Sequence, residues 1–319
     1  MSVKEFIKTA TLAADDEDII ERIDIKERLI SNALVNSQRE IPGVGCTYDA
    51  DVTAFVEEYE KLKLNCGYRL TFNALMMKVL AEGLKAAPRL NAHFQYNHTS
   101  TSGRLIVKKH IDVTMPVCLE NNETFQVKVK HLEDKSLMET ANEIEEVKSR
   151  LANTNVKRVL FKVAGQRMIG YAISGKIRST FAQFFSAYFG KNKIAKFSKL
   201  FRKKYYHDPK KKKGPSLKVD DFTEGTVCFT NWGTLYENLN VNITYIPPLY
   251  PQVFMFGTGK IKDVQQVYKK DDGTIDVCTK KILPLTMVFD HKIGGAVDLM
   301  PFIRKMDEIF ASPEIIHKW

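Results

Sequence analysis

The sequence predicts an α/β protein, because apolar runs with helical spacing alternate with short apolar runs of strand length. The chain has 319 residues, which is enough for a large core in one large domain or two smaller ones. Its 44% hydrophobic and 27% charged residues are ordinary for a folded globular protein. The strongest local feature is a buried strand near the C-terminus that ends in an Asp-His pair, followed by two glycines and an apolar helix pattern.

Helical periodicity predicts four helices in the first half of the chain. The first follows a run of acids, which the helix dipole favours at an N-terminus, and the fourth starts near Ser136. The expected helices cover 19–37, 52–64, 71–88 and 132–151. Between them, strand-like runs cover 45–52, 105–107, 111–118 and 125–129.

Short strands dominate the C-terminal third of the chain. They are expected at 226–230, 252–257, 264–268, 275–279 and 282–289. Asp271-Asp272-Gly273 reads as a hairpin turn between two of these strands. After Gly295, apolar residues at helical spacing predict a final helix that ends near Phe310.

Charge is distributed very unevenly along the chain. The net charge is +10, yet residues 155–218 alone carry +17, with Asp208 as their one acid, so the remainder carries −7. Gly165, Gly170 and Gly175 are expected to interrupt regular structure in the first part of this basic segment. Two amphipathic aromatic patterns follow, from Ile177 and again from Ile194, with lysines and arginines between the aromatic positions.

Several classes of protein are not expected. No run of about 18 apolar residues predicts a transmembrane helix, and the N-terminal segment has no secretory signal pattern. The five cysteines are scattered with no CxxC pair, which favours a reducing cytoplasm over a disulfide framework or a zinc site. No metal is expected, since metal-ligand spacing is missing among His93, His98, His110 and His131.

His291 is the candidate functional residue that the pattern itself picks out. It comes just after the strand Leu285–Phe289, and a tight turn follows it. The strand backbone is stiff, and the turn would leave the imidazole facing a cleft. An imidazole with an ordinary pKa near 6.5 is largely a free base at neutral pH and suits proton transfer. A histidine that simply packs at a strand end is the alternative, and the stretch alone does not decide between them.

Blocks across the chain resemble a known family. Gly225-Thr226-Val227-Cys228-Phe229-Thr230-Asn231-Trp232-Gly233 resembles "GGTFTISNLG", and the segment from Pro284 to Ile303 resembles "MPLSLSFDHRVIDGA" and the residues after it. Further blocks match in order at 41–54, 71–92, 132–151 and 247–259. The chain thus resembles the catalytic domain of the acyltransferase component of 2-oxo-acid dehydrogenase complexes, in the chloramphenicol acetyltransferase superfamily. The resemblance covers nearly everything except residues 1–15 and 155–220.

The resemblance implies the architecture and the substrates. It implies one catalytic domain over residues 1–319, a two-layer sandwich of helices on a mixed sheet, with the basic segment 155–218 as an insertion. Members form trimers with the active site in a channel between subunits, and a homotrimer is therefore expected. A coenzyme A thioester is the expected co-substrate, and no covalently bound cofactor is implied. We see no lipoyl domain, so a complete core subunit of a dehydrogenase complex is not expected.

The resemblance also implies roles for residues. The family's base matches His291, and the hydroxyl that hydrogen-bonds the oxyanion matches Thr230, with Asn231 beside it. Such an oxyanion donor is worth about 3 kcal/mol of barrier. Asp290 and Lys292 match the residues that flank the family's histidine. The residues that would contact coenzyme A are not identified by any matching motif.

The turn after the histidine departs from the family pattern. The family's aspartate, which braces the histidine loop, falls on Gly295. Asp298 lies three residues further on, inside the predicted helix, and is not expected to be its equivalent. Loss of the brace weakens positioning, and a misplacement of about 1 Å can cost about 100-fold in rate.

Two functions remain open from the sequence. The first is an acyltransferase that moves an acyl group from a coenzyme A or carrier thioester to a hydroxyl, amine or thiol. The second is a non-catalytic scaffold or sensor of the same fold. For the basic insertion, residues 176–214 suit an anionic membrane surface, with a cytoplasmic protein held at the membrane and a lipid as acceptor. A helical hairpin with solvated charges is the alternative, and nucleic acid is not expected.

Overall fold

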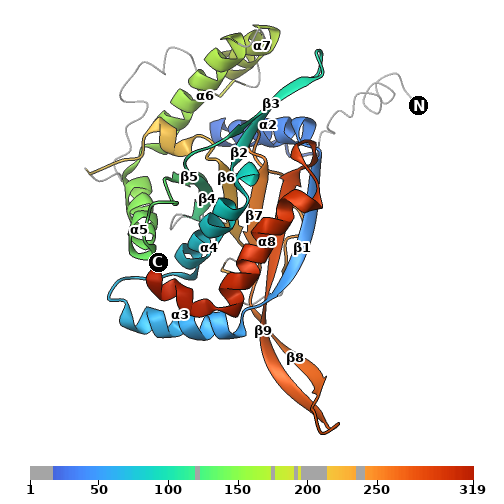
Figure 1. The fold of residues 1–319 in the computed structure, drawn as a ribbon. Helices are drawn as coiled ribbons and strands as arrows, with labels where there is room; N and C mark the ends of the chain where they lie inside the picture. The colour runs from blue at the N-terminus through green and yellow to red at the C-terminus, as the bar shows by residue number, and fades with distance from the viewer. Residues whose placement is uncertain (1–16, 119–122, 174–176, 190–192, 195–213, 235–240) are drawn as a thin grey trace. The chain divides into compact units, whose positions relative to one another are not determined.

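The chain is described here by a computed structural model that covers residues 17–118, 123–173, 177–189, 193–194, 214–234 and 241–319 (Figure 1). It divides into two compact units. One comprises Met1–Ser31 with Leu160–His207, and the other comprises Asn32–Val159 with Asp208–Trp319. The prediction of a single domain with an insertion stays a prediction, and the two units are described separately.

The larger unit is built on a seven-stranded mixed sheet. Its main strand order is β1-β9-β7-β6-β4-β5, and β8 pairs with the free half of β9. β6 runs parallel to both β4 and β7, and the other pairings are antiparallel. The strands are β1 (Gly43–Asp51), β4 (Val113–Cys118), β5 (Thr124–Val129), β6 (Val227–Asn231), β7 (Phe254–Thr258), β8 (Lys262–Lys269) and β9 (Ile275–Asp290).

Helices form the second layer of this unit, as expected. They are α3 (Thr53–Asn65), α4 (Phe72–Ala86), α5 (Leu137–Asn153) and α8 (Ala296–Ala311). α4 packs between α5 and α8, and Figure 1 shows α4 and α8 side by side in front of the strands. Thr71 caps α4 by accepting the N–H of Ala74, and Ser136 and Glu139 form a capping box at the start of α5. The predicted two-layer α/β sandwich with a mixed sheet is therefore confirmed.

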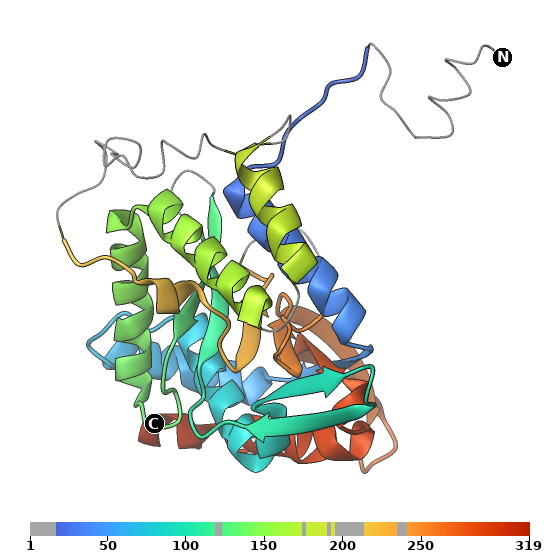
Figure 2. The same ribbon diagram turned by 90° about the horizontal axis from the view of Figure 1, so that it is seen from above.

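Short elements connect these layers. β2 (Ala92–Asn97) and β3 (Ser102–Val107) form a separate two-stranded antiparallel sheet, seen edge to edge in Figure 2. The 3-10 turns are η1 (Pro88–Leu90), η4 (Val219–Phe222), η5 (His291–Ile293) and η6 (Pro313–Lys318). η1 and η5 matter most here, because they lie at the two sides of the histidine loop.

Some strands differ from those predicted from the sequence. β9 is one strand over residues 275–290, where two strands were expected, and β2 was not predicted at all. Lys280 and Lys281 lie between the two expected strands. The half of β9 that contains them pairs with β8 in a ribbon with exposed residues, where charges are compatible with strand structure. Figure 1 shows this β8–β9 ribbon extending away from the sheet.

The smaller unit contains helices of the basic segment. α6 (Val156–Ile173) crosses the boundary between the units, as does α2 (Ile25–Glu40), and α7 (Ile177–Tyr188) lies within the smaller one. The reading of Gly165 and Gly170 as breaks is wrong, because both lie inside α6. α7 confirms the first helical pattern, whereas most of the second pattern and Lys210–Lys213 lie outside the described residues. Among the helices described, none is both long and apolar enough to cross a membrane.

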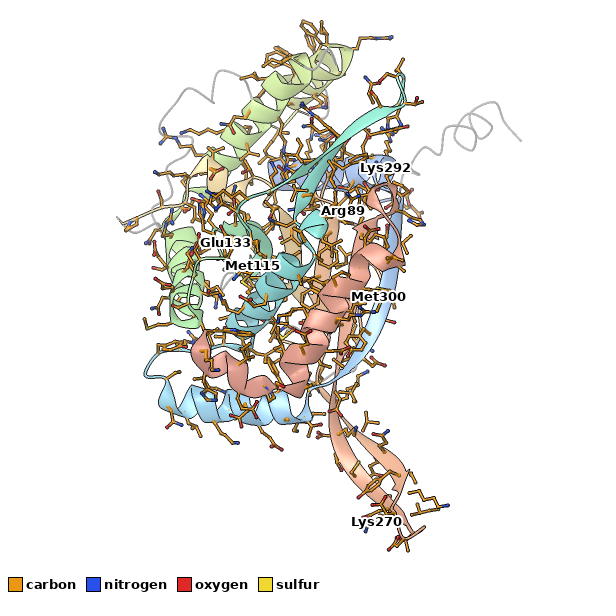
Figure 3. The ribbon with its side chains drawn as sticks, in the orientation of Figure 1. Arg89, Met115, Glu133, Lys270, Lys292 and Met300 are labelled. Atoms are coloured by element: carbon orange, nitrogen blue, oxygen red, sulfur yellow. The ribbon has the colours of Figure 1, made fainter. Side chains whose placement is uncertain are left out.

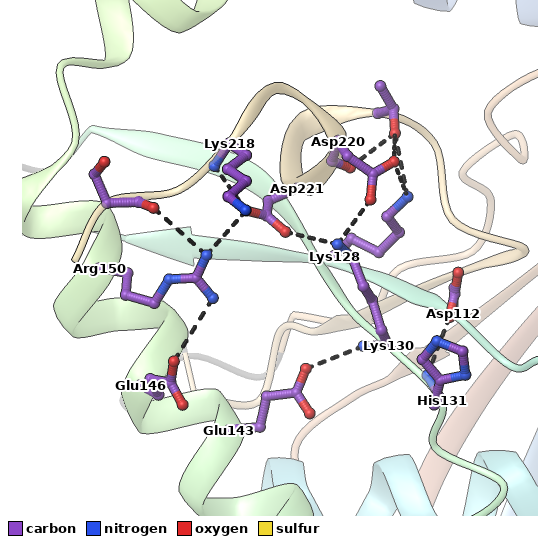
Figure 4. A network of polar contacts seen from close by, with 12 residues as sticks. Asp112, Lys128, Lys130, His131, Glu143, Glu146, Arg150, Lys218, Asp220 and Asp221 are labelled. Atoms are coloured by element: carbon purple, nitrogen blue, oxygen red, sulfur yellow. Dashed lines mark hydrogen bonds and ion pairs between the residues drawn. The ribbon is translucent and has the colours of Figure 1, made fainter.

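A charged network fastens the chain just before β6 (Figure 4). Lys128, whose residue surface is 7% exposed, donates to Asp220 at 3.1 Å, and Lys130 lies 2.9 Å from Asp221. Arg150 of α5 also pairs with Asp221, at 3.2 Å. Hydrogen bonds from Lys130 and Lys128 hold the pKa of Asp220 at about 2. The network therefore ties η4 to β5 and α5 and sets where β6 begins.

Gly83 illustrates how tightly α8 packs on α4. A Cβ at position 83 would lie 2.5 Å from the Phe302 ring, which is itself fully buried against Phe254. Alanine ordinarily stabilises a helix interior by about 1 kcal/mol relative to glycine. Here we expect Gly83→Ala to lower the free energy of unfolding by about 1–3 kcal/mol in urea titrations, because overpacking dominates. Phe302→Leu should reduce that cost in a double-mutant cycle, and an undiminished cost would contradict the packing argument.

Candidate active site

The candidate site is built around the end of β9. Asp290, the last residue of the strand, pairs with Gly43 of β1, and its N–H donates to the carbonyl of Val253 at 2.8 Å. The next N–H, that of His291, donates to the Pro42 carbonyl at 3.0 Å. Backbone contacts from both sides therefore fix the start of η5, while His291 itself is exposed.

The orientation of the His291 ring is set by a backbone carbonyl. Its Nδ1 lies 2.9 Å from the carbonyl oxygen of Gly294. A carbonyl oxygen only accepts hydrogen bonds, so this contact requires a proton on Nδ1. In the neutral ring the lone pair then lies on Nε2, and Nε2 is the nitrogen able to accept a proton from a substrate. The arrangement therefore suits general base chemistry.

Asp290 and Lys292, the residues that flank the histidine, contact each other. Oδ1 of Asp290 accepts the N–H of Lys292 at 3.0 Å, and its Oδ2 lies 3.4 Å from the Lys292 ammonium. That ammonium also donates to the Glu40 carbonyl and lies over the rings of Phe94 and Tyr96, at 5.3 and 5.6 Å from their centroids. Burial raises the pKa of Asp290, although Lys292 opposes the shift. The Asp290–Lys292 pair therefore ties the start of the loop to the Glu40 carbonyl.

A second ion pair holds the other side of the loop. Arg89 of η1 donates to the Ile293 carbonyl at 2.6 Å, and its Nε lies 3.4 Å from Oδ1 of Asp298. Oδ2 of Asp298 accepts the N–H of Gly295 at 3.0 Å. Figure 3 labels Arg89, which comes from η1, and Lys292, which comes from η5. The backbones of residues 293, 294 and 295 are thus each hydrogen-bonded. Ile293 bonds to Arg89, Gly294 to the imidazole of His291, and Gly295 to Asp298.

Asp298 was not expected to be an equivalent of the family's aspartate, yet its carboxylate contacts this loop. Gly295 is the N-cap of α8 and Asp298 occupies its N3 position, from which a side chain naturally reaches back to the N-cap N–H. This local helix-start pattern could have been recognised in the sequence. The partner Arg89 could not, because it comes from a distant turn.

Glycines in the loop differ in the space around them. A Cβ on Gly294 would lie 2.1 Å from the Asp298 carboxylate, so position 294 needs glycine to admit that side chain. A Cβ on Gly295 would meet no atom within 4 Å. The position where the family pattern has its aspartate therefore has room for a side chain but holds none.

We expect Asp298→Asn to reduce turnover, because it would loosen the loop that positions the His291 imidazole while leaving that imidazole present. Asparagine keeps an acceptor for the Gly295 N–H but loses the charge that attracts Arg89, so the loop should loosen. Thioester turnover should fall by about 10- to 100-fold in kcat, with little change in KM. Glu308→Gln, an exposed neutralisation further along α8, is the matched control and should leave turnover unchanged. Equal losses in both variants would contradict a positioning role.

Thr230 and Asn231 end β6 and are both buried. The side-chain amide of Asn231 donates to the Asn73 side chain at the start of α4, at 2.6 Å. Thr230 pairs with Gly257 of β7, and Gly257 pairs with Thr286 of β9. The sheet therefore aligns Thr230 with the middle of β9 and not with its end.

One chain does not bring Thr230 and His291 together. From Thr286 to the end of β9 at Asp290 is about 13 Å of strand, and β6 is two strands away from β9, which adds roughly 10 Å across the sheet. A single tetrahedral intermediate spans only a few ångströms. The two residues can act on one substrate only if they come from different copies of the chain.

Comparison with known proteins identifies the family. Residues 16–162 and 203–317 match the family described as 2-oxoacid dehydrogenases acyltransferase (catalytic domain). The chain belongs to that family, as the sequence resemblance predicted, and its class is that of the acyltransferases. The match is interrupted over residues 163–202, which lie in the basic segment.

Individual relatives agree with this assignment. The chain is 30% identical over 140 residues to the dihydrolipoyllysine-residue acetyltransferase component of pyruvate dehydrogenase complex of Staphylococcus aureus (strain COL). The match covers 43% of this chain and 31% of that protein, so the chain spans only about a third of its relative. The Staphylococcus epidermidis counterpart (strain ATCC 35984) is 29% identical over 136 residues, covering 42% of this chain and 30% of that protein.

Solved structures share the fold. The cubic core of the pyruvate dehydrogenase multienzyme complex aligns with a TM-score of 0.61 and 17% identity, covering 95% of this chain and 96% of that one. An Azotobacter vinelandii dihydrolipoamide acetyltransferase aligns with a TM-score of 0.60, also at 17% identity and with the same coverage. At this identity the likeness establishes the architecture and not the reaction.

Proposed function

We propose that this chain transfers an acyl group from a coenzyme A or carrier thioester to a thiol, hydroxyl or amine acceptor. The observation that carries the proposal is the contact of His291 Nδ1 with the Gly294 carbonyl, which leaves Nε2 of an exposed imidazole as the base. The family of the chain supports the same reaction class. No bound cofactor is needed, because both the donor and the acceptor are substrates.

In the proposed mechanism, the acceptor's S–H, O–H or N–H gives its proton to Nε2 of His291 as its heteroatom attacks the thioester carbonyl carbon. The carbonyl oxygen becomes an oxyanion, to which the Thr230 hydroxyl donates a hydrogen bond. Collapse of this intermediate breaks the C–S bond, and the proton on Nε2 passes to the departing thiolate. The imidazole thus returns to its starting state.

We further propose that the site forms between copies of the chain. The strand register separates His291 from Thr230, so the Thr230 hydroxyl would come from a neighbouring copy. A homotrimer meets this requirement with three equivalent sites, and the relatives with solved structures include an assembled cubic core. The buried Asn231 would support Thr230 through its bond to Asn73.

The first acceptor to test is a dithiol. The Staphylococcus aureus relative is named a dihydrolipoyllysine-residue acetyltransferase. The purified chain should be incubated with acetyl-CoA and longer acyl-CoA esters, each with dihydrolipoamide, an alcohol or an amine, and the acylated acceptor measured by mass spectrometry. Product above a His291→Gln control supports the transferase. If no donor–acceptor pair gives such product, the proposal falls and a non-catalytic scaffold or sensor becomes the better account.

We also infer that the basic segment contacts an anionic membrane surface. α7 exposes Ile177, Phe181 and Phe185, which recur at i, i+4 and i+8 on one helix face. A helix with such a face in a segment of net charge +17 is suited to the interface of a bilayer with acidic lipids. A lipid acceptor would be compatible with that location.

Vesicle sedimentation tests this inference. The full chain should co-sediment with phosphatidylserine-containing vesicles and not with neutral phosphatidylcholine vesicles, and raised salt should weaken the association. The double variant Phe181→Glu with Phe185→Glu should remain in solution. Val267→Glu is the matched control, because Val267 is exposed on the β8–β9 ribbon. The inference fails if the native chain ignores anionic vesicles or the control loses binding equally.

A further inference from the structure

Two histidines and a glutamate meet at one end of the β4–β5 pair. His110 lies just before β4, and His131 and Glu133 lie just after β5. These antiparallel strands begin pairing at Val113 and Val129, so the segments beyond them run side by side. One possible ligand atom from each of the three side chains lies within 4.8 Å of the other two. In the part of the chain that the structure describes, no other such group occurs.

Glu133 is oriented toward both imidazoles. Its Oε2 accepts the N–H of Ile111 at 2.7 Å, which fixes the carboxylate. Its Oε1 lies 2.5 Å from Nδ1 of His110 and 3.8 Å from Nδ1 of His131. The centroids of the two imidazole rings are 4.2 Å apart. One carboxylate oxygen is therefore occupied by the backbone, and the other lies between the two rings.

The backbone holds His131 in an uncommon conformation. Its φ is +55°, in the left-handed region that few residues other than glycine adopt. Its N–H donates to Asp112 at 3.0 Å, as Figure 4 shows, and the next N–H, of Leu132, donates to the Ile111 carbonyl at 3.0 Å. The Leu132 side chain is fully buried. These contacts turn the histidine ring back toward Glu133, and such local strain is a recurring feature of ligand sites.

We propose that His110, His131 and Glu133 bind a divalent transition-metal ion such as Zn²⁺. Two imidazoles and one carboxylate are a common ligand set for zinc sites that keep further positions open. Tetrahedral coordination puts ligand atoms about 3.3 Å apart, a spacing that lies between the 2.5 and 3.8 Å of the two contacts from Glu133 to the histidines. The side chains of His110 and His131 are 41% and 49% exposed, so an ion can enter from solvent.

The site is separate from the histidine loop. The sheet aligns Val113 of β4 with Val227 of β6, and the aligned strands lead across β7 to Phe289 of β9. Three strand spacings, or about 14 Å, therefore lie between the proposed metal ligands and the end of β9. The ion would clamp the ends of β4 and β5 and take no part in proton transfer at His291. The inference does not depend on the proposed acyl transfer.

Metal titration of the full chain tests the proposal. After treatment with a chelator, the chain should bind one equivalent of Zn²⁺ by calorimetry, and Co²⁺ should give the visible absorption of a site with nitrogen and oxygen ligands. Bound Zn²⁺ should raise the thermal unfolding midpoint. His110→Ala, His131→Asn and Glu133→Gln should each lower the affinity by more than about 10-fold, since even changes around a ligand shell can cost that much. Asparagine is chosen at position 131 because it tolerates a positive φ.

Other histidine–glutamate pairs provide the matched controls. His98 lies 3.0 Å from Glu40, and His317 lies 3.0 Å from Glu58, without the second imidazole that completes the proposed site. His98→Asn and His317→Asn should leave the affinity and the Co²⁺ spectrum unchanged. The proposal is overturned if the native chain takes up no zinc, or if the three ligand variants bind as tightly as the native chain. His110 and Glu133 would then be a hydrogen-bonded pair only.

Discussion

His291→Gln should abolish most of the acyl transfer while leaving the fold intact. Glutamine has a size close to that of histidine but cannot accept a proton at neutral pH. General bases contribute about 10²- to 10⁴-fold to rates, so kcat/KM for the best donor–acceptor pair should fall by that amount. The ascending limb of the pH–rate profile, which reports the base of the free enzyme, should disappear in the variant. Steady-state assays across pH measure both effects.

The stability of the variant provides the control. His291 is exposed, so its replacement should hardly change the urea unfolding midpoint. A variant that unfolds much more easily would mean that lost structure, and not a lost base, explains the lower rate. Retention of native turnover by a stable His291→Gln chain would exclude this histidine as the base.

Thr230→Val should lower kcat by about 10²- to 10³-fold, because the hydroxyl that would bind the oxyanion is replaced by a methyl group of similar shape. Thr230→Ser retains the donor and should keep most of the rate. Since Thr230 is buried, both variants must also be compared by urea unfolding. A rate loss of the same size in the serine variant would argue that side-chain packing and not hydrogen bonding matters.

Because the strand register separates Thr230 from His291 within one chain, combining the two variants tests whether the site is shared between chains. Chains carrying His291→Gln and chains carrying Thr230→Val should each be inactive alone. When they are co-expressed and assemble together, some sites combine a native His291 from one chain with a native Thr230 from its neighbour, and activity should return. Mixing the two proteins after separate purification, without subunit exchange, is the control. No recovery in proven mixed oligomers would contradict a shared site.

Local pattern was sufficient to locate the histidine loop. The strand that ends at Asp290, the turn after it and the helix after Gly295 all follow from short-range periodicity, and the family resemblance identified the reaction class. The continuous β9 was missed because two lysines, at 280–281, separate its two apolar runs. The strand continues through them because this part of β9 pairs with β8. Sequence spacing cannot report such pairing.

Long-range geometry accounts for the rest of what was missed. The bond of Arg89 to the Ile293 carbonyl joins elements far apart in the chain, and no local rule predicts it. The separation of Thr230 from His291 depends on strand order and register, which a single sequence does not determine. The cluster of His110 and His131 likewise exists only because β4 and β5 pair.

The open space at Gly295 bears on how degenerate motifs are interpreted. A carboxylate there would clash with nothing, so steric exclusion does not explain the lack of an aspartate at this position. The Asp298 carboxylate reaches the same loop from the first turn of the following helix. In this chain a carboxylate at the start of the helix therefore holds the loop although position 295 carries none. Classifying a protein as inactive because one motif letter has changed would overlook a carboxylate that reaches the same loop from another position.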